Sequence, residues 1–242
     1  MRSEKLQAFV LSTHDYGESD LIVSLFTLEH GHIKGFARGG RKSRKRFGSS
    51  LELLARIDLQ ARCKEGLSSL QQGESISLYP QIRSDLSLIA HGLYSAELLD
   101  ILTPEGHPYP RIFRLFSAWM EHLESGAFIP ADRRFFEINL LNILGYRPAL
   151  DHCSCCSETY GSRGALVMKD GELGCRQCAR GGQPVNSETL VHLQRALATG
   201  SFGKGIFSDD SLQQAGMILD RALAHHAGRT IKSLSFLNQM TE

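Results

Sequence analysis

Residues 51–78 read LELLARIDLQARCKEGLSSLQQGESISL, two strand-like runs on either side of a turn. In the first run, Ile57, Leu59 and Ala61 alternate with polar or charged neighbours, the period-two pattern of a half-buried strand. The segment 64–66 (Lys-Glu-Gly) supplies turn residues, after which the apolar pattern returns. The stretch therefore predicts two consecutive strands.

Similar short strands are expected throughout the residues before this stretch. Glycine-containing turns separate the apolar runs, and five short strands in about eighty residues are typical of a small barrel. The OB-fold is the natural candidate for a barrel of this size. The expected strands lie near 7–11, 20–27, 32–38, 51–63 and 67–78.

The remainder of the chain changes character and shows apolar residues at helical spacing. Helices are expected near 86–99, 111–123, 130–144, 187–198 and 208–227, whereas 229–242 is polar and mixed. We therefore expect an α+β multidomain protein, an OB-fold β-barrel followed by an α-helical domain with an inserted four-cysteine zinc finger. The expected boundaries are 1–80 for the barrel, 81–150 for the first helical part, 151–180 for the zinc-finger module and 181–242 for the second helical part.

A cysteine-rich segment interrupts the helices. It contains two C-x₂-C pairs separated by an 18-residue spacer, a spacing typical of zinc sites. Two intervening residues let a tight turn point both sulfurs at one ion, and two such turns complete a tetrahedron. The spacer predicts a short hairpin that turns at Asp170-Gly171. The pattern predicts one structural Zn²⁺ bound by Cys153, Cys156, Cys175 and Cys178.

Other readings of these cysteines remain open. The two pairs could be accidental or redox-active turns, and His152 and Cys155 are competing ligands. The side chain of Cys155 should point away from the ion, because its neighbour Cys156 is a ligand. Cys63, in a predicted strand, is expected to be a small core residue.

A catalytic zinc is a rival hypothesis. His122 and Glu124 precede the first cysteine pair and resemble the H-x-E…P-C-x-x-C pattern of zinc-dependent deaminases. However, His152 rather than proline precedes Cys153, and the second pair would have no role. Four thiolates also leave no open position for water or substrate. We expect no enzymatic activity, and no phosphate-binding, dinucleotide-binding or nucleophile-elbow motif is present.

Charge is unevenly distributed along the chain. The net charge is only +1, but residues 1–80 hold 12 Lys/Arg against 9 Asp/Glu. No acidic residue occurs between Lys34 and Ser50. Because the flanks are rich in glycine and serine, we expect residues 38–50 to form a mobile loop on the barrel, called here the basic loop. The candidate DNA-binding residues are Lys34, Arg38, Arg41, Lys42, Arg44, Lys45 and Arg46.

Flexible cations suit a phosphodiester backbone better than a sequence-specific groove contact. Phe36 and Phe47 lie among the charges and could stack on bases. The alternatives are a solvated surface loop or a barrel rim that binds an acidic protein. No secretory signal or membrane-spanning segment is evident, so the expected location is the cytoplasm, where clustered thiols stay reduced.

The sequence resembles the RecO family of bacterial recombination mediators. The resemblance covers essentially the whole chain and includes the order of parts. Its most specific part is the N-terminal motif, Ala8-Phe9-Val10-Leu11, Tyr16-Gly17-Glu18-Ser19-Asp20, Leu25-Phe26-Thr27, Gly31 and Ala37-Arg38-Gly39-Gly40-Arg41-Lys42-Ser43. The tail resembles the family too, at Ile231-Lys232-Ser233 and Phe236-Leu237. The chain departs from many relatives at Leu51-Glu52-Leu53-Leu54, where those have a proline and an aromatic residue after the leucine.

The resemblance implies a DNA-binding protein of DNA repair and recombination. Such proteins bind single- and double-stranded DNA, anneal complementary strands without ATP, and work with RecR and often RecF. Together they load RecA onto DNA coated by single-stranded-DNA-binding protein, whose acidic tail some relatives bind. The family's charged barrel loop matches Arg38, Arg41, Lys42, Arg44, Lys45 and Arg46, and its zinc ligands match the four cysteines. A protein that only bridges other proteins is the main alternative. Association with the nucleoid during repair is a further expectation.

Overall fold

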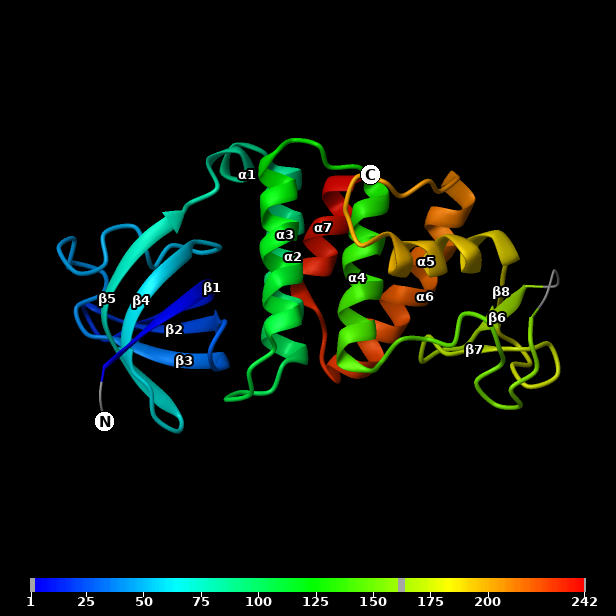
Figure 1. Cartoon of the computed structure of the whole chain (residues 1–242), viewed down its shortest axis with the longest axis horizontal. Helices are drawn as coiled ribbons and strands as arrows, with labels where there is room; N and C mark the ends of the chain where they lie inside the picture. Colours follow the sequence, from blue (N-terminus) through cyan, green and yellow to red (C-terminus); the bar gives the residue numbers. More distant parts are fainter. Residues whose placement is uncertain (1–2, 161–163, 242) are drawn as a thin grey trace. The chain divides into compact units, whose positions relative to one another are not determined.

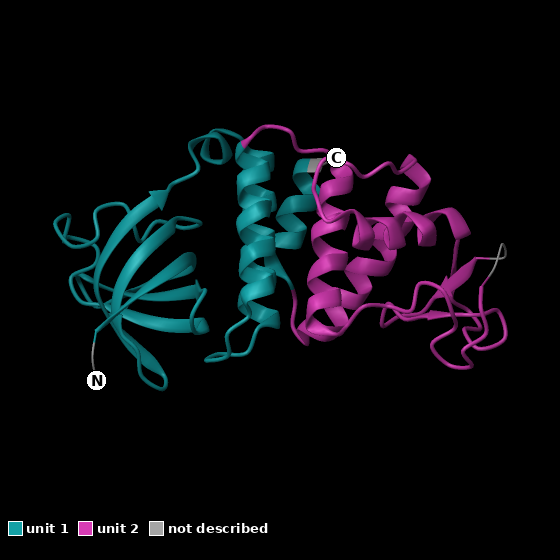
Figure 2. Ribbon diagram, viewed as in Figure 1, with its two compact units in different colours: residues 1–124, 231–242 teal, residues 125–230 magenta. Residues whose placement is uncertain are grey.

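The computed structural model describes residues 3–160 and 164–241. Its contacts divide the chain into two compact units (Figure 2). The first unit comprises Met1–Glu124 and Ile231–Glu242, and the second comprises Ser125–Thr230. The finer division at 80, 150 and 180 stays a prediction.

The first unit begins with a closed five-stranded barrel, as the sequence predicts (Figure 1). The strand order is β1-β2-β3-β5-β4, in which β3 and β5 are parallel and the other neighbouring pairs are antiparallel. This arrangement of five strands is that of an OB-fold. The strands are β1 (Glu4–Tyr16), β2 (Asp20–Thr27), β3 (Gly31–Ala37), β4 (Arg56–Arg62) and β5 (Leu67–Ser77).

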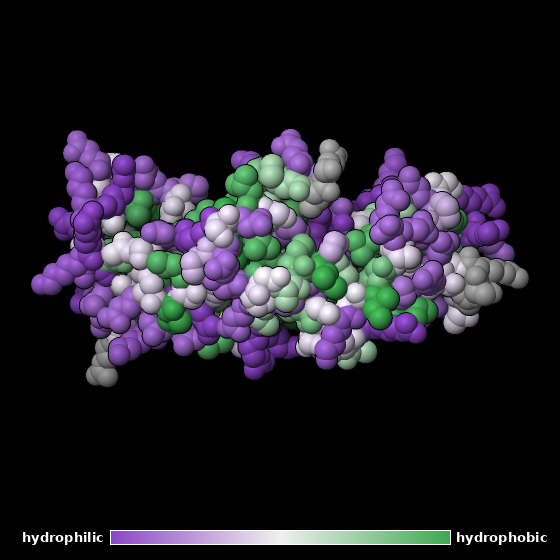
Figure 3. Space-filling view, turned by 90° about the horizontal axis from the view of Figure 1, so that it is seen from above, coloured by the Kyte–Doolittle hydropathy of each residue, from purple (hydrophilic) through white to green (hydrophobic). Residues whose placement is uncertain are grey.

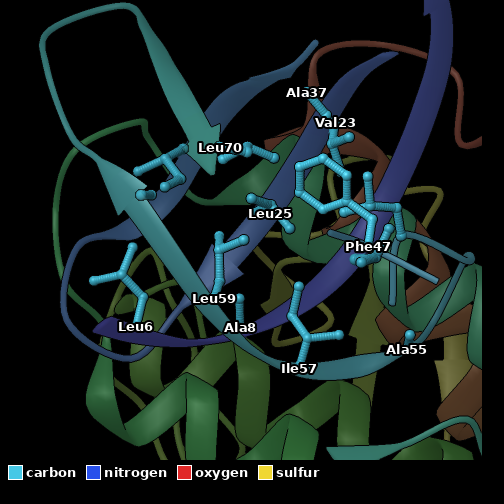
Figure 4. Close-up of a cluster of buried hydrophobic side chains, with 14 residues drawn as sticks. Leu6, Ala8, Val23, Leu25, Ala37, Phe47, Ala55, Ile57, Leu59 and Leu70 are labelled. Carbon is cyan, nitrogen blue, oxygen red and sulfur yellow. The ribbon is translucent and has the colours of Figure 1, made fainter. Parts of the chain in front are cut away.

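The period-two alternation of β4 correctly predicts which side chains fill the barrel. Ile57, Leu59 and Ala61 are at most 1% exposed, and Figure 4 shows Ile57 and Leu59 among the labelled core residues. The predicted start of this strand at residue 51 is wrong. Leu54 has φ of 66°, a left-handed conformation that ends the preceding turn, so the strand begins at Arg56.

Four helices complete the described part of the first unit. Asp85 caps α2, where its carboxylate accepts hydrogen bonds from the backbone N–H groups of Ser87 and Leu88. The last helix, α7, was not expected from the polar C-terminal sequence. It packs on α2, and the Glu97 carboxylate accepts hydrogen bonds from two N–H groups at the start of α7. The helices are α1 (Pro80–Ser84), α2 (Leu86–Leu102), α3 (Pro110–Glu124) and α7 (Lys232–Thr241).

Aromatic side chains join the barrel to these helices. The Phe9 ring lies 5.2 Å from that of Phe113 and 4.8 Å from that of Phe116, both on α3. Phe9 is fully buried, so it anchors β1 against the helical layer. The barrel and its supporting helices therefore share one packed unit.

In its described residues, 125–160 and 164–230, the second unit combines three helices with a small sheet. Its helices are α4 (Pro130–Leu144), α5 (Ser187–Thr199) and α6 (Asp209–Ala227), and its strands are β6 (Ala165–Val167), β7 (Leu173–Gly174) and β8 (Gln183–Val185). The sheet has the order β7-β6-β8. Within residues 3–160 and 164–241, no helix is long and apolar enough to cross a membrane.

A buried ionic network ties α4 to α6. The Glu137 carboxylate is fully buried and accepts hydrogen bonds from Arg133 at 2.8 Å and from Arg134 at 2.7 Å. Both guanidinium groups also contact Asp220 on α6. Paired charges are the form in which ionic groups are tolerated inside a protein.

Candidate metal centre and basic loop

The four cysteines chosen from the sequence come together in the second unit. Cys153, Cys156, Cys175 and Cys178 have sulfur atoms that all lie within 4.8 Å of one another. The sulfurs of Cys156 and Cys175 are 3.8 Å apart. A tetrahedral Zn²⁺ with Zn–S bonds of about 2.3 Å separates its ligands by about 3.8 Å. The group therefore has the donors and the spacing for one tetrahedral metal ion.

Two backbone turns present the sulfurs. In the first, the N–H of Ser157 donates to the carbonyl of Cys153 at 2.9 Å, and Ser157 adopts a left-handed φ of 62°. In the second, the N–H groups of Cys178 and Ala179 donate to the carbonyl of Cys175 at 3.1 and 2.9 Å. Each C-x₂-C pair thus forms the tight turn that the spacing predicts.

The spacer between the turns is the hairpin expected from Asp170-Gly171. Strands β6 and β7 pair antiparallel, with Val167 opposite Leu173. Gly171 has φ of 85°, and a Cβ there would lie 2.3 Å from the backbone nitrogen of Ala222. Only glycine fits this turn, which brings the second cysteine pair back beside the first.

The electrostatics of the group favour metal binding. Hydrogen bonds from the backbone N–H groups of Cys175 and Cys156 lower the pKa of Cys153 to about 6. Hydrogen bonds with the neighbouring thiols of Cys156 and Cys175 raise the pKa of Cys178. Crowded sulfurs therefore resist carrying several negative charges, and a divalent cation would neutralise them. Cys155 is exposed and lies outside the group.

His122 and Glu124, the residues of the deaminase hypothesis, lie on α3 and outside the four-cysteine group. Glu124 accepts hydrogen bonds from the backbone N–H groups of Gln81 at 3.0 Å and Ile82 at 3.1 Å, at the start of α1. His122 lies on the same helix, α3. Among the described residues, neither side chain belongs to a group that could hold a metal. The Glu124 carboxylate instead holds the start of α1, a tertiary contact that the local sequence does not reveal.

The basic loop is a series of turns. The N–H groups of Lys42 and Ser43 donate to the carbonyl of Gly39, and the N–H of Phe47 donates to the carbonyl of Ser43. Phe47 itself is 2% exposed and packs inside the barrel (Figure 4). The prediction that Phe47 stacks on bases is therefore wrong, because the barrel core covers its ring.

Tyr16 is an exposed aromatic residue beside the basic loop, next to Phe36. Phe36 is half-buried and packs edge-on against Tyr16, with 5.8 Å between ring centroids. Tyr16 is 57% exposed at the end of β1. Tyr16 belongs to the N-terminal motif quoted above but was not predicted to stack on bases. This pair can offer a ring face to a base, whereas Phe47 cannot.

The seven candidate cations fall into two groups. Three of them have partners within the protein. Lys34 forms an ion pair with Glu105 at 2.6 Å, and Arg41 forms one with Asp15 at 3.2 Å. Arg46 donates hydrogen bonds to Ser43 Oγ at 3.1 Å and to the carbonyl of Arg38. The other four side chains are exposed, and none forms an ion pair within the described parts of the chain. They are Arg38, Lys42, Arg44 and Lys45.

The surface around the barrel is strongly polar. On the face shown in Figure 3, hydrophilic residues cover much of the barrel at the left of the view. Four exposed cations close in sequence, with no ion-pair partner among the described residues, create a local positive potential that the net charge of +1 conceals.

Comparison with known proteins assigns the family. The model described as "Recombination protein O C terminal" matches residues 83–235, and the one described as "Recombination protein O N terminal" matches residues 1–79. The chain belongs to the RecO family. The chain matches curated RecO relatives over nearly their full length. Membership of this family assigns the chain a role in DNA repair and recombination.

Three curated RecO relatives illustrate the match. The DNA repair protein RecO of Pelobacter propionicus is 54% identical, covering 100% of this chain and 98% of its own length. The RecO protein of Geobacter sulfurreducens is 47% identical, and the match covers 100% of both chains. That of Geobacter metallireducens is 46% identical over 99% of both chains. The resemblance seen in the sequence is thereby confirmed.

Proposed function

We propose that this chain is a recombination mediator that binds single- and double-stranded DNA and anneals complementary strands without ATP. With RecR, and RecF where it is required, it helps to load RecA onto DNA coated by single-stranded-DNA-binding protein. The observation that carries the proposal is a group of exposed cations on the basic loop that form no ion pair with residues 3–160 or 164–241, namely Arg38, Lys42, Arg44 and Lys45.

The physical basis is electrostatic. Each phosphate contact releases condensed counterions, which favours binding without regard to base sequence. A surface that neutralises two backbones reduces their repulsion and brings the strands together. Base pairing between the strands then supplies the sequence recognition, so the protein needs no catalytic group.

We also propose that Cys153, Cys156, Cys175 and Cys178 bind one structural Zn²⁺. The small sheet β7-β6-β8 has only two to three residues in each strand. Such short strands form a small apolar core, so metal ligation would supply much of the folding free energy of this module. The closed coordination sphere leaves no position for a substrate.

The alternative function is protein bridging without direct DNA activity. The same cations could bind an acidic protein segment, including the acidic tail of single-stranded-DNA-binding protein. The two functions differ in what the cations bind, so a DNA-binding measurement with a loop variant distinguishes them.

The test compares two variants with the same loss of charge. The loop variant replaces Arg38, Lys42, Arg44 and Lys45 by alanine, and the control replaces Lys5, Arg62, Lys64 and Arg111, exposed cations elsewhere in the first unit. Single-stranded DNA affinity is measured over a range of salt. Four phosphate contacts predict a slope of log K against log salt of about −3 for the wild type.

The loop variant should lose most of that slope and bind at least about tenfold more weakly at low salt. The control should behave like the wild type. Equal losses in both variants would mean that net charge, not the basic loop, drives binding. Unchanged affinity in the loop variant would place the DNA surface elsewhere.

A further inference from the structure

Three side chains with different metal-binding chemistry meet at one end of the barrel. Glu4 begins β1, His30 lies in the turn between β2 and β3, and Cys63 follows the last residue of β4. One ligand atom from each lies within 4.8 Å of the other two. Because β4 runs from the basic loop to Arg62, Cys63 lies at the end of the strand away from that loop.

The geometry of the three groups is already close to that of a metal site. His30 Nε2 lies 3.1 Å from Glu4 Oε2, and the Cys63 sulfur lies within 4.8 Å of a ligand atom of each of them. Neighbouring nitrogen and oxygen ligands of a tetrahedral Zn²⁺ are about 3.3 Å apart, given bonds of about 2.0–2.1 Å. Only a small movement of the sulfur would be needed to complete three bonds.

Backbone contacts hold the histidine in place. The N–H of His30 donates to Thr27 Oγ1 at 3.0 Å, and the same hydroxyl donates to the carbonyl of Gly31 at 3.0 Å. The side chains of His30 and Glu4 are 38% and 43% exposed, whereas Cys63 is half-buried. An ion can therefore reach the group from solvent, while these hydrogen bonds hold the backbone from which the imidazole projects.

We propose that Glu4, His30 and Cys63 form a second metal site, which binds a divalent, borderline-soft cation of the Zn²⁺ type. Thiolate, imidazole and carboxylate together suit this class of ion better than Mg²⁺ or Ca²⁺, which prefer oxygen ligands. The protein supplies three ligands, so water fills a fourth position. The ion would tie together the start of β1, the β2–β3 turn and the end of β4.

The site differs from the four-cysteine group in chemistry. It offers one thiolate instead of four and leaves one position open, so its ion should be more weakly held and exchangeable. The competing explanation is an exposed histidine–carboxylate ion pair beside an unrelated thiol. That explanation gives no role to Cys63 in metal binding, which is the difference the experiment uses.

The experiment adds Co²⁺ to the full chain after one equivalent of Zn²⁺ has filled the stronger site. The proposal predicts that the wild type binds one further equivalent and develops a thiolate-to-cobalt charge-transfer band. Cys63→Ser should abolish this band, and His30→Ala should weaken Co²⁺ binding at least about tenfold. Glu4→Gln, which preserves side-chain shape, should also weaken it.

Matched controls use an exposed cysteine and an exposed histidine outside the site. Cys155→Ser and His14→Ala should bind the further equivalent as the wild type does. Circular dichroism confirms that each variant is folded. A wild type that binds no further equivalent, or a charge-transfer band that survives in Cys63→Ser, would overturn the proposal.

Discussion

The Arg46 guanidinium lies 5.2 Å from the ring centroid of its neighbour Phe47, and the two residues link the basic loop to the barrel core. Phe47 is 2% exposed among the side chains that fill the barrel, whereas Arg46 is only half-buried and hydrogen-bonds within the loop. The loop that carries the exposed cations is therefore anchored by a core residue. Barrel packing and loop conformation should respond together to a change at Phe47.

Phe47→Ala is expected to destabilise the barrel by about 3–5 kcal/mol, because it removes a large buried ring and leaves a cavity. The same change should weaken DNA binding, since the loop loses its anchor. Urea denaturation and DNA titration of the folded fraction measure the two effects. Phe47→Leu is the matched control and should retain most of both properties. Full DNA affinity in a destabilised Phe47→Ala protein would show that the loop does not depend on this anchor.

Cys175→Ser is expected to lose stoichiometric zinc and to destabilise the second unit by several kcal/mol, since structural Zn²⁺ contributes about 10–16 kcal/mol in zinc-finger peptides. Metal analysis and thermal denaturation measure the effect. The exposed Cys155 provides the control, because Cys155→Ser should leave both metal content and stability unchanged. Zinc that remains bound in Cys175→Ser with unchanged stability would refute the four-cysteine assignment.

Glu137→Gln is expected to lower the free energy of unfolding by about 3 kcal/mol, because it leaves the charges of Arg133 and Arg134 poorly compensated inside the protein. Asp220→Asn should cost less, since the Asp220 side chain is 32% exposed while that of Glu137 is fully buried. Urea denaturation measures both. Equal losses in the two variants would contradict this distinction.

Mild acid should destabilise the second unit through His226. Its ring stacks on that of Tyr146 at 4.1 Å, and burial, with a smaller effect of His225, lowers the pKa of His226 below 6.5. The unfolded chain then binds a proton more readily than the folded chain, so stability falls as the pH drops below about 6.5. His226→Gln should reduce this pH dependence and His14→Gln should not. Stability curves of wild type and His226→Gln that run parallel between pH 7 and pH 5.5 would contradict the account.

Local sequence patterns correctly predict the inward-facing residues of a strand and the cysteines that come together. Alternation identifies the inward residues of β4, and the two C-x₂-C spacings identify the sulfurs that converge. The missed helix α7 has a weak signal in the sequence, because polar residues lie between the buried Ile231, just before the helix, and the buried Leu237 within it. A search for sparse apolar residues at helical spacing could have found it.

Tertiary contacts account for what the sequence does not reveal. Nothing near Glu124 indicates that its carboxylate binds the start of α1, 43 residues away. Phe47 follows a run of charged residues in the sequence, yet its side chain lies in the barrel core. Glu4, His30 and Cys63 have no recognisable spacing, and only closure of the barrel brings them together.

Strand annealing is the decisive property to measure. Two complementary DNA strands, each coated with single-stranded-DNA-binding protein, are mixed with the purified chain in the absence of ATP. Annealing should be faster with the protein than without it, and the acceleration should fade as salt rises and be lost when Arg38, Lys42, Arg44 and Lys45 are replaced by alanine. No acceleration by a folded, metal-loaded wild type, or full acceleration by the loop variant, would rule out annealing through the basic loop.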